Sequence, residues 1–143
     1  MHDGSDYDVF ATSFFSCRYK SFIKEICQAR TFCLKDDVEM LRANGFAQGG
    51  SLDNAVVVDE NGILNEGGLR FPDEFVRHKL LDCVGDFALL GLPIYGHIVA
   101  KRSGHAFHHA FVEKFFLEKD AWQTKFINTA GDLIPRTEEQ FAN

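Results

Sequence analysis

Apolar residues recur at helical spacing in several parts of the chain. Phe22, Ile23 and Ile26 repeat three or four positions apart with polar residues between them, and such positions share one face of a helix. Pro72 suits the first turn of a further helix, which Gly91 would end. The spacing therefore predicts helices over residues 19–29, 36–44, 73–90 and 104–119.

Shorter apolar runs predict strands. Residues 54–59 are rich in valine, which favours a pleated conformation, and the Asn61-Gly62 pair that follows is typical of a two-residue hairpin turn. Residues 94–102 and 122–127 are further runs of strand length. Because helices and strands mix with hairpin connections and without a β-α-β series, the predicted fold class is a layered α+β structure.

The predicted helix 73–90 has two chemically different faces. At about 100° per residue, apolar residues such as Cys83 fall on one arc, while His78, Asp82 and Asp86 fall on the opposite one. His78 and Asp82 are one turn apart, with Cβ atoms roughly 5–6 Å apart, so the two side chains could hold one divalent cation. The alternative is an ordinary amphipathic helix with a solvated polar face. The metal interpretation needs a second domain or subunit to cover that face.

The composition describes a globular protein with unusually many phenylalanines. The 143 residues suit one domain, and 45% hydrophobic with 25% charged residues is ordinary for such a domain. The 15 phenylalanines indicate a bulky aromatic core or a site for an apolar ligand. A net charge of −6 argues against nonspecific nucleic-acid binding, although a local group of Lys and Arg could still hold phosphates.

The cysteine pattern and the hydropathy of the chain indicate the cellular compartment in which the protein works. Cys17, Cys27, Cys33 and Cys83 form no C-x-x-C pair and no zinc-finger spacing. Three of the four lie among apolar residues, which predicts buried free thiols and a reducing, cytoplasmic compartment. No apolar run reaches the roughly 18 residues of a membrane span, and the N-terminus lacks the basic segment of a signal peptide. We therefore expect a cytosolic protein, or a piece of one.

Four stretches of the sequence resemble one protein family. They are Ala29–Phe32, Gly45–Asp59, Leu64–Asp86 and Ser103–Ala106. Together, from about residue 18 to about residue 127, they resemble the C-terminal domain of UDP-3-O-acyl-N-acetylglucosamine deacetylase, a zinc amidase of lipid A synthesis. Residues 1–17 and 128–143 lie outside the resemblance. The fold that it implies is a two-layer α+β sandwich of a mostly antiparallel sheet packed on helices, with a small β-α-β insert at about residues 31–57.

The resemblance also implies a metal and a catalytic pair. His78 and Asp82 match the two zinc ligands that the family's second domain provides. His105 matches the family's catalytic histidine, and Asp86 matches the carboxylate that holds it. Three other histidines lie in predicted helices or strands, and we expect them to be structural or solvated. They are His97, His108 and His109.

Further positions match residues that contact the substrate. Thr31 matches a hydroxyl beside the reacting carbonyl, and Lys79 matches a basic residue near the phosphates. Arg102 stands where the family has a lysine that meets the uridine diphosphate, so the charge is kept but the geometry differs. The insert forms a hydrophobic passage for the acyl chain in the family, and seven residues match its positions: Phe32, Val38, Ala47, Gly50, Ser51, Ala55 and Val57. Ordinary packing of a small subdomain is the alternative for each of them.

The resemblance covers only the second half of the family's machinery. The first domain supplies a zinc-binding histidine and an adjacent glutamate base, and no Glu-His pair occurs in this sequence. We therefore expect the C-terminal half of a zinc-dependent deacetylase acting on acylated UDP-N-acetylglucosamine, inactive without the N-terminal domain. The alternative is a truncated paralogue or a binding module that recognises the acylated UDP-sugar without turnover.

Overall fold

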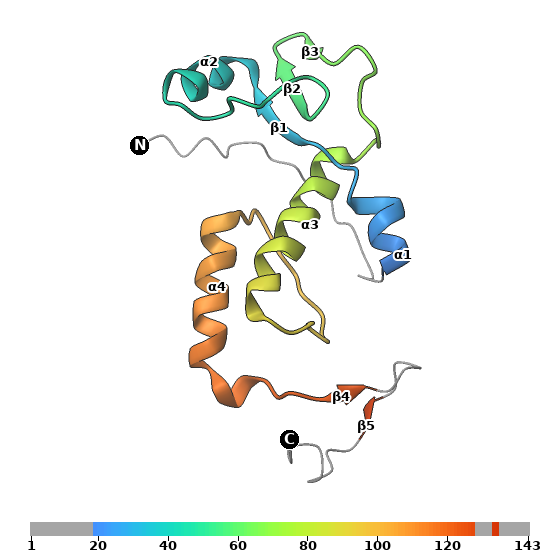
Figure 1. Ribbon diagram of the computed structural model, residues 1–143, viewed down its shortest axis with the longest axis vertical. Coiled ribbons are helices and arrows are strands. Elements are labelled where there is room, and N and C mark those ends of the chain that lie inside the picture. The colour runs from blue at the N-terminus through green and yellow to red at the C-terminus, as the bar shows by residue number, and fades with distance from the viewer. Residues whose placement is uncertain (1–18, 128–132, 135–143) are drawn as a thin grey trace.

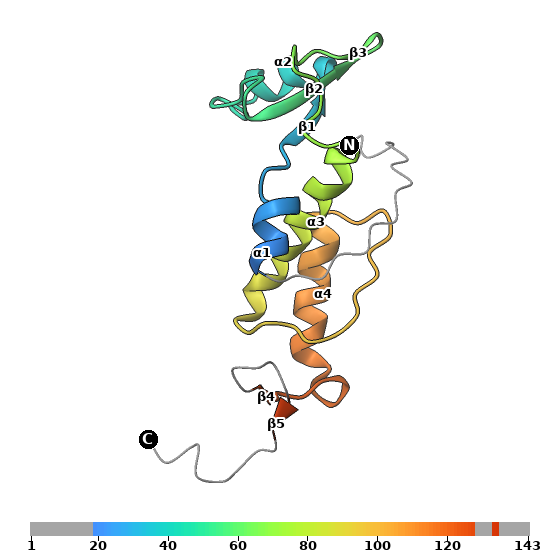
Figure 2. The ribbon, with the colours of Figure 1, turned by 90° about the vertical axis from the view of Figure 1, so that its right-hand side faces the viewer.

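The computed structural model describes residues 19–127 and 133–134. A small sheet lies at one end of the molecule, and the long helix α3 (Glu74–Phe87) leads away from it, with α1 (Tyr19–Ser21) and α4 (His105–Leu117) on either side of α3 (Figures 1 and 2). The fold is α+β, as predicted. Among the described residues, no helix combines the length and apolar character that crossing a membrane requires.

The helical part is held together by an aromatic core between α3 and α4. Cys83 and Phe87 of α3 are buried with Val112 of α4, and Leu90 packs against them from a 3-10 turn, Ala88–Leu90. The Phe87 and Phe111 rings lie 5.0 Å apart. Pairs of aromatic rings at this distance add to the free energy of apolar burial. The apolar arc expected for residues 73–90 is therefore the face that joins the two helices.

The sheet contains a β-α-β unit. Strand β1 (Thr31–Leu34) runs parallel to β2 (Ala55–Asp59), with Thr31 opposite Ala55. A parallel pair needs a crossover connection, and α2 (Lys35–Ala43) with the loop after it provides one. The predicted hairpin is present, since β3 (Gly62–Ile63) pairs antiparallel with β2. Asp59 lies opposite Gly62, so the turn residues are Glu60 and Asn61, one position earlier than the predicted Asn61-Gly62 pair. The unit of β1, α2 and β2 is the β-α-β insert of the expected fold, and β3 lies beyond the expected bounds of that insert.

The predicted helix boundaries hold to within a few residues, but one predicted strand does not form. Residues 94–102 contain no strand, and Tyr95 and Val99 are 82% and 67% exposed. An apolar run can pair as a strand only where another backbone offers hydrogen bonds, and in the described residues no strand lies beside this segment. The predicted strand 122–127 shortens to β4 (Phe126–Ile127), which pairs antiparallel with β5 (Leu133–Ile134). The predicted helix 19–29 becomes α1 followed by a π-helical turn, Phe22–Ile26.

The cysteines differ from the expectation of buried thiols. Cys83 is buried, Cys33 is partly buried and Cys27 is exposed, and all three are free. Cys27 lies at the end of the π-helical turn, where its thiol contacts the carbonyl oxygen of Ile23 at 3.1 Å rather than the core. Cys17 lies outside the described residues.

Candidate metal and catalytic site

His78 and Asp82 lie together on the polar face of α3. Nε2 of His78 is 3.2 Å from Oδ1 of Asp82, and the two side chains are 16% and 10% exposed. Two zinc ligands in tetrahedral geometry, each about 2.0–2.2 Å from the ion, stand roughly 3.4 Å apart. The spacing of these two atoms therefore fits joint coordination of one zinc ion.

The ring of His78 is oriented from the segment that precedes β1. Nδ1 of His78 lies 3.3 Å from the carbonyl oxygen of Ala29. Because a carbonyl oxygen only accepts hydrogen bonds, this contact favours the tautomer that carries its proton on Nδ1. In that tautomer, the lone pair of Nε2 faces Asp82 and is available to a metal. Hydrogen bonds of this kind commonly orient metal-binding histidines.

His105, the first residue of α4, reaches the same face of α3. Its Nδ1 is 2.8 Å from Oδ2 of Asp86, and its Nε2 is 3.8 Å from Oδ1 of Asp82. Gly104 occupies the N-cap position of α4 in an extended conformation, so the loop delivers His105 directly onto α3. The side chain of His105 is 60% exposed. The candidate metal-binding pair, His78 and Asp82, thus lies next to the pair formed by His105 and Asp86, and Asp82 is the point of contact.

The carboxylate of Asp86 contacts three histidines, whereas the sequence analysis anticipated only His105. Besides His105, Nδ1 of His108 is 2.7 Å from Oδ2, and Nε2 of His109 is 3.4 Å from Oδ1. Burial would by itself raise the pKa of Asp86, but hydrogen bonds from His108 and His105 bring it below its usual value. The sequence signal for this was present, because residues three and four positions apart share a helix face.

A second arrangement of metal-binding groups overlaps this one. Ligand atoms of Asp86, His105 and His108 lie within 4.8 Å of one another, close enough to hold a metal ion. However, both ring nitrogens of His108 already have partners, Asp86 and the Ser103 hydroxyl at 2.9 Å. A metal at this place would have to break these bonds. The pair formed by His78 and Asp82 needs no such rearrangement, and the geometry favours it.

The polar face is less open than the sequence suggested. Side chains of His78, Asp82 and Asp86 are only 16%, 10% and 14% exposed. The cover comes from this chain, because Ala29 approaches from one side and His105 from the other. A second domain is thus not required to remove most of this face from water.

Two of the predicted substrate residues lie beside His78. The Phe32 ring is 6.0 Å from the His78 ring, and Nζ of Lys79 stands 5.6 Å from the centre of the Phe32 ring. Nζ of Lys79 is also 3.2 Å from Oδ2 of Asp82. Thr31 is exposed at the start of β1, two positions after Ala29. Arg102 is exposed in the loop that leads to α4, with a positive φ of 47°.

The remaining residues of the expected acyl passage are spread over the insert. Val38 lies on α2, and Ala55 and Val57 lie on β2. Ala47, Gly50 and Ser51 lie in the loop between these elements. Ala55 is buried, Val38, Gly50 and Val57 are partly buried, and Ala47 and Ser51 are exposed. They share one subdomain, the insert.

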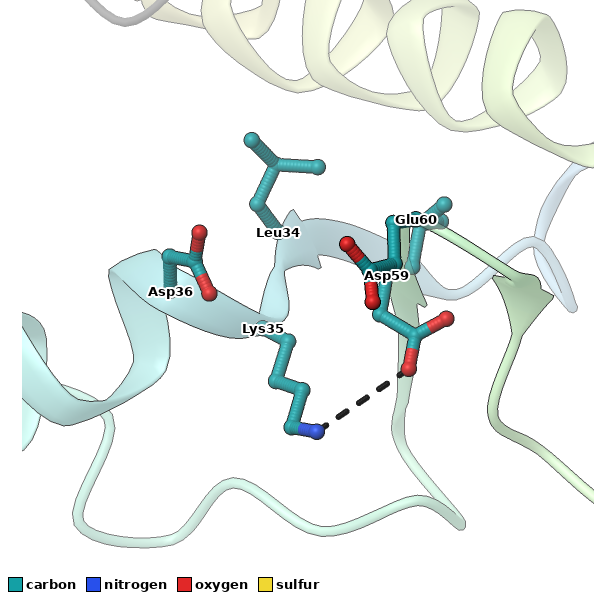
Figure 3. A pocket seen from close by; sticks show the side chains of 6 residues that line it. Leu34, Lys35, Asp36, Asp59 and Glu60 are labelled. Atoms are coloured by element: carbon teal, nitrogen blue, oxygen red, sulfur yellow. Dashed lines mark ion pairs between the residues drawn. The ribbon is translucent and has the colours of Figure 1, made fainter.

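A cavity of about 370 Å³ lies elsewhere in the insert, where β1 ends (Figure 3). Three acidic side chains, those of Asp36, Asp59 and Glu60, line it together with Lys35, whose Nζ is 3.9 Å from Oδ2 of Asp59. None of the predicted site residues lines this cavity. Its acidic lining is also unsuited to an acyl chain or to phosphates.

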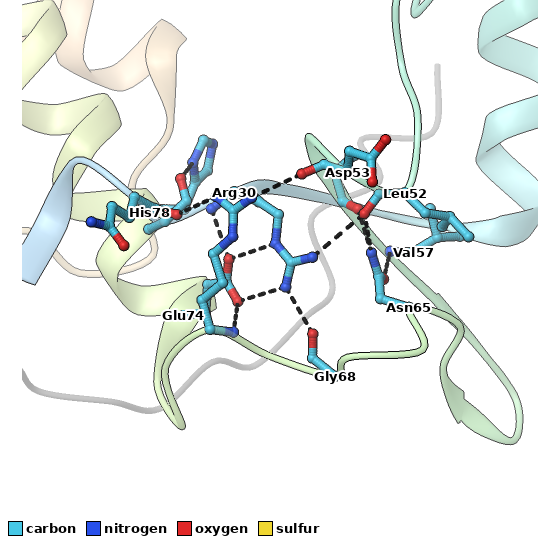
Figure 4. A network of polar contacts seen from close by, with 12 residues as sticks. Arg30, Leu52, Asp53, Val57, Asn65, Gly68, Glu74 and His78 are labelled. Atoms are coloured by element: carbon cyan, nitrogen blue, oxygen red, sulfur yellow. Dashed lines mark hydrogen bonds and ion pairs between the residues drawn. The ribbon is translucent and has the colours of Figure 1, made fainter.

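A buried ion pair that sequence reasoning missed supports the site. Glu74 is fully buried and accepts hydrogen bonds from Nε, Nη2 and the backbone N–H of Arg30 at 2.9, 3.0 and 2.9 Å (Figure 4). The backbone N–H of Arg70 donates to the same carboxylate at 2.6 Å. Burial would raise the pKa of Glu74, but these bonds lower it from 4.5 to about 2. The pair joins the first turn of α3 to the segment entering β1.

Comparison with known proteins assigns the family. The model of UDP-3-O-acyl N-acetylglycosamine deacetylase matches residues 5–117. This chain is similar to two proteins named UDP-3-O-acyl-N-acetylglucosamine deacetylase. The one from Syntrophotalea carbinolica is 56% identical over 104 residues, which cover 73% of this chain and 34% of the relative. The one from Anaeromyxobacter dehalogenans is 54% identical over 113 residues, which cover 79% of this chain and 37% of the relative. The relative from Pseudomonas entomophila is 48% identical over 111 residues, 78% of this chain and 37% of its own length. This chain thus spans about a third of the length of the relatives that it matches, and it belongs to the UDP-3-O-acyl N-acetylglycosamine deacetylase family.

Proposed function

We propose that this chain is the C-terminal part of a cytoplasmic, zinc-dependent deacetylase of lipid A synthesis. Its substrate would be UDP-3-O-acyl-N-acetylglucosamine, which loses its 2-acetyl group as acetate. The observation that carries the proposal is the meeting of two functional pairs, His78 with Asp82 and His105 with Asp86, whose closest approach is 3.8 Å. The names of the relatives support the substrate and the reaction.

In this proposal His78 and Asp82 hold the zinc ion. When bound, zinc supplies Lewis acidity, which polarises a carbonyl and lowers the pKa of water toward about 7. The Ala29 carbonyl keeps Nδ1 of His78 protonated and leaves Nε2 for the metal. Lys79 neutralises the other oxygen of Asp82, 3.2 Å away, so that the carboxylate stays in place beside the ring of His78.

His105 is suited to proton transfer. Asp86 accepts a hydrogen bond from Nδ1 of His105 at 2.8 Å, which orients the ring for a role as general acid. Nε2 lies 3.8 Å from Oδ1 of Asp82, on a side chain that is 60% exposed, where it can protonate the departing amine. The hydroxyl of Thr31, two positions beyond the carbonyl that orients His78, would donate a hydrogen bond to the developing oxyanion.

The insert and the loop before α4 would bind the rest of the substrate. Lys79 and Arg102 are the cations assigned to the phosphates. Phe32, on strand β1 of the insert, lies 6.0 Å from the ring of His78 and 5.6 Å from Nζ of Lys79. An acyl chain attached close to the reacting amide would therefore pass Phe32 and continue toward Gly50 and the strand β2.

The chain requires a partner segment for turnover. A catalytic zinc site has three protein ligands and a water, and we assign only two ligands here. The relatives are about three times as long as the matched region. We propose that an N-terminal domain supplies the third ligand, a histidine, together with a glutamate that removes the proton from the attacking water.

The test is reconstitution. The 143-residue chain is fused to the part of the Anaeromyxobacter dehalogenans relative that precedes its matched region, and acetate release and zinc content are measured beside the chain alone. We expect turnover from the fusion and none from the chain alone. A fusion that binds zinc and the acylated UDP-sugar but releases no acetate would instead identify a binding module. Turnover by the chain alone would contradict the two-ligand assignment.

A further inference from the structure

His108 is the most buried histidine of the candidate site, and neither the family resemblance nor the proposed mechanism gives it a role. Its side chain is 2% exposed, whereas that of His105, one helical turn earlier, is 60% exposed. Both of its ring nitrogens have partners: Nδ1 lies 2.7 Å from Oδ2 of Asp86, and Nε2 lies 2.9 Å from Oγ of Ser103. The Phe87 ring contacts the imidazole edge-on at 5.6 Å.

The directions of these hydrogen bonds follow from the carboxylate. An ionised carboxylate only accepts, so Nδ1 of His108 and Nδ1 of His105 both donate to the same oxygen, Oδ2 of Asp86. A neutral His108 then has a lone pair on Nε2, which accepts the hydroxyl proton of Ser103. The result is a continuous chain of hydrogen bonds from Ser103 through His108 and Asp86 to His105.

His105 depends on this chain because little else holds its ring. An imidazole that is 60% exposed is not fixed by packing, and its shortest polar contact in the structure is with Asp86. Asp86 in turn sits between the exposed ring of His105 and the packed ring of His108. The Ser103 contact also ties the loop that carries His105 to the body of the domain, two residues before His105 itself.

We propose that His108 is a positioning residue for His105. It anchors the Asp86 carboxylate through Nδ1 and the Ser103 loop through Nε2, and so keeps His105 aimed at the reacting group. The proposal rests on the deacetylase function above only for its kinetic consequence. The hydrogen bonds themselves lie within this protein and can be measured without turnover.

Two amide variants separate the two contacts of His108. Asparagine places its amide nitrogen near the position of Nδ1, so His108→Asn keeps a donor for Asp86 and loses the Ser103 contact. Glutamine places its amide near Nε2, so His108→Gln keeps a partner for Ser103 and loses the donor to Asp86. His109→Gln is the matched control, because His109 is 53% exposed and 3.4 Å from Asp86.

Kinetics of the fusion form one arm of the test. We expect His108→Gln to lower kcat about 10- to 100-fold, the usual cost of removing an outer orienting group, with KM and zinc content unchanged. His108→Asn should restore most of kcat, and His109→Gln should cause a smaller loss than His108→Gln. An unchanged kcat in His108→Gln, or equal losses in both amide variants, would overturn the positioning role.

Nuclear magnetic resonance of the full 143-residue chain forms the other arm. The Nδ1 proton of His105 should exchange slowly with water in the unaltered chain and in His108→Asn, and faster in His108→Gln. If the fusion is inactive, the proposed function fails, but this measurement still tests the hydrogen-bond chain. Equal exchange rates in all three forms would overturn the positioning role of His108.

Ser103, His108 and Asp86 are hydrogen-bonded in the same order as the residues of a serine-hydrolase triad. Covalent labelling of Ser103 by a fluorophosphonate would therefore show a nucleophile and would contradict a purely positioning role.

Discussion

Nε of Arg30 donates to Oε1 of Glu74 at 2.9 Å, and the side chain of Glu74 is completely out of contact with water. Glu74 lies one helical turn before His78 on α3, while Arg30 directly follows Ala29, whose carbonyl oxygen contacts the His78 ring. The ion pair therefore fixes two segments far apart in the sequence at the place where the ring of His78, the proposed metal ligand, is oriented. The same contact sets the starting point of β1, and with it Thr31.

Removing the carboxylate should destabilise the protein strongly. Glu74→Ala leaves the guanidinium of Arg30 buried and without its carboxylate, and breaking a buried ion pair on one side typically costs about 3–5 kcal/mol. We expect a loss of this size in the free energy of unfolding, measured by urea denaturation. Glu66→Ala is a suitable control, because Glu66 is exposed in the loop before α3, and it should change stability little.

The same pair predicts a dependence of stability on acid. The pKa of Glu74 is about 2 in the folded protein against 4.5 for the free side chain, so the folded state prefers the ionised form. This contribution is fully present above about pH 4.5 and is lost as the pH falls toward 2. A shift of this size corresponds to about 3 kcal/mol. Urea denaturation between pH 7 and pH 3 should show a smaller loss in Glu74→Gln than in the unaltered chain, and parallel curves would argue against this origin.

Much of the helical architecture could be read from the sequence, and the reason is local. Helix 73–90 shows its apolar arc within a few turns, so its existence and its buried face followed from spacing, and its starting region followed from Pro72. The hairpin after β2 is equally local, because two residues signal a turn, although the turn forms at Glu60 and Asn61, one position before the Asn61-Gly62 pair. The strand expected at 94–102 failed for the opposite reason. Its pattern was suitable, but a strand also needs a partner, and periodicity says nothing about partners.

The site divides in the same way. The pair of His78 and Asp82 was visible because its members are one turn apart. The approach of His105 to Asp86 was anticipated from the family resemblance rather than from spacing, and the structure brings these residues to 2.8 Å. Arg30 and Glu74 are 44 positions apart, and nothing in either local sequence marks the charge as buried.

Substitutions in the fusion should separate metal binding from proton transfer. His78→Ala and Asp82→Ala should each remove zinc and with it activity, because each deletes one of only two ligands that we assign to this chain. His105→Ala should keep zinc yet lower kcat by about 10²–10⁴-fold, the usual contribution of a general acid or base. Metal content is measured on the same samples as kcat. Stoichiometric loss of zinc from the His105 variant would mean that His105 is a ligand.

The structure also refines the expectation for the loop of the insert. Gly50 closes a turn, since its backbone N–H donates to the carbonyl oxygen of Ala47 at 3.0 Å. A Cβ atom added at Gly50 would stand 3.1 Å from that oxygen, whereas one added at Gly49 would meet nothing within 4 Å. A side chain at Gly50 must therefore displace its surroundings, and a side chain at Gly49 need not. The two glycines form a matched pair for testing the acyl passage.

Gly50→Leu should shorten the acyl chain that the enzyme accepts. If residues 31–57 hold the acyl chain, a leucine at this point takes the space of several methylenes, and each methylene denied burial forfeits about 0.8 kcal/mol, or about fourfold in kcat/KM. The loss should grow with acyl length and nearly vanish for a short-chain substrate, while zinc content stays constant. The measurement is kcat/KM across an acyl-length series for the fusion, its Gly50→Leu variant and the Gly49→Leu control. A loss equal at every length would show damage to the turn at Ala47 instead, and the passage assignment would fail.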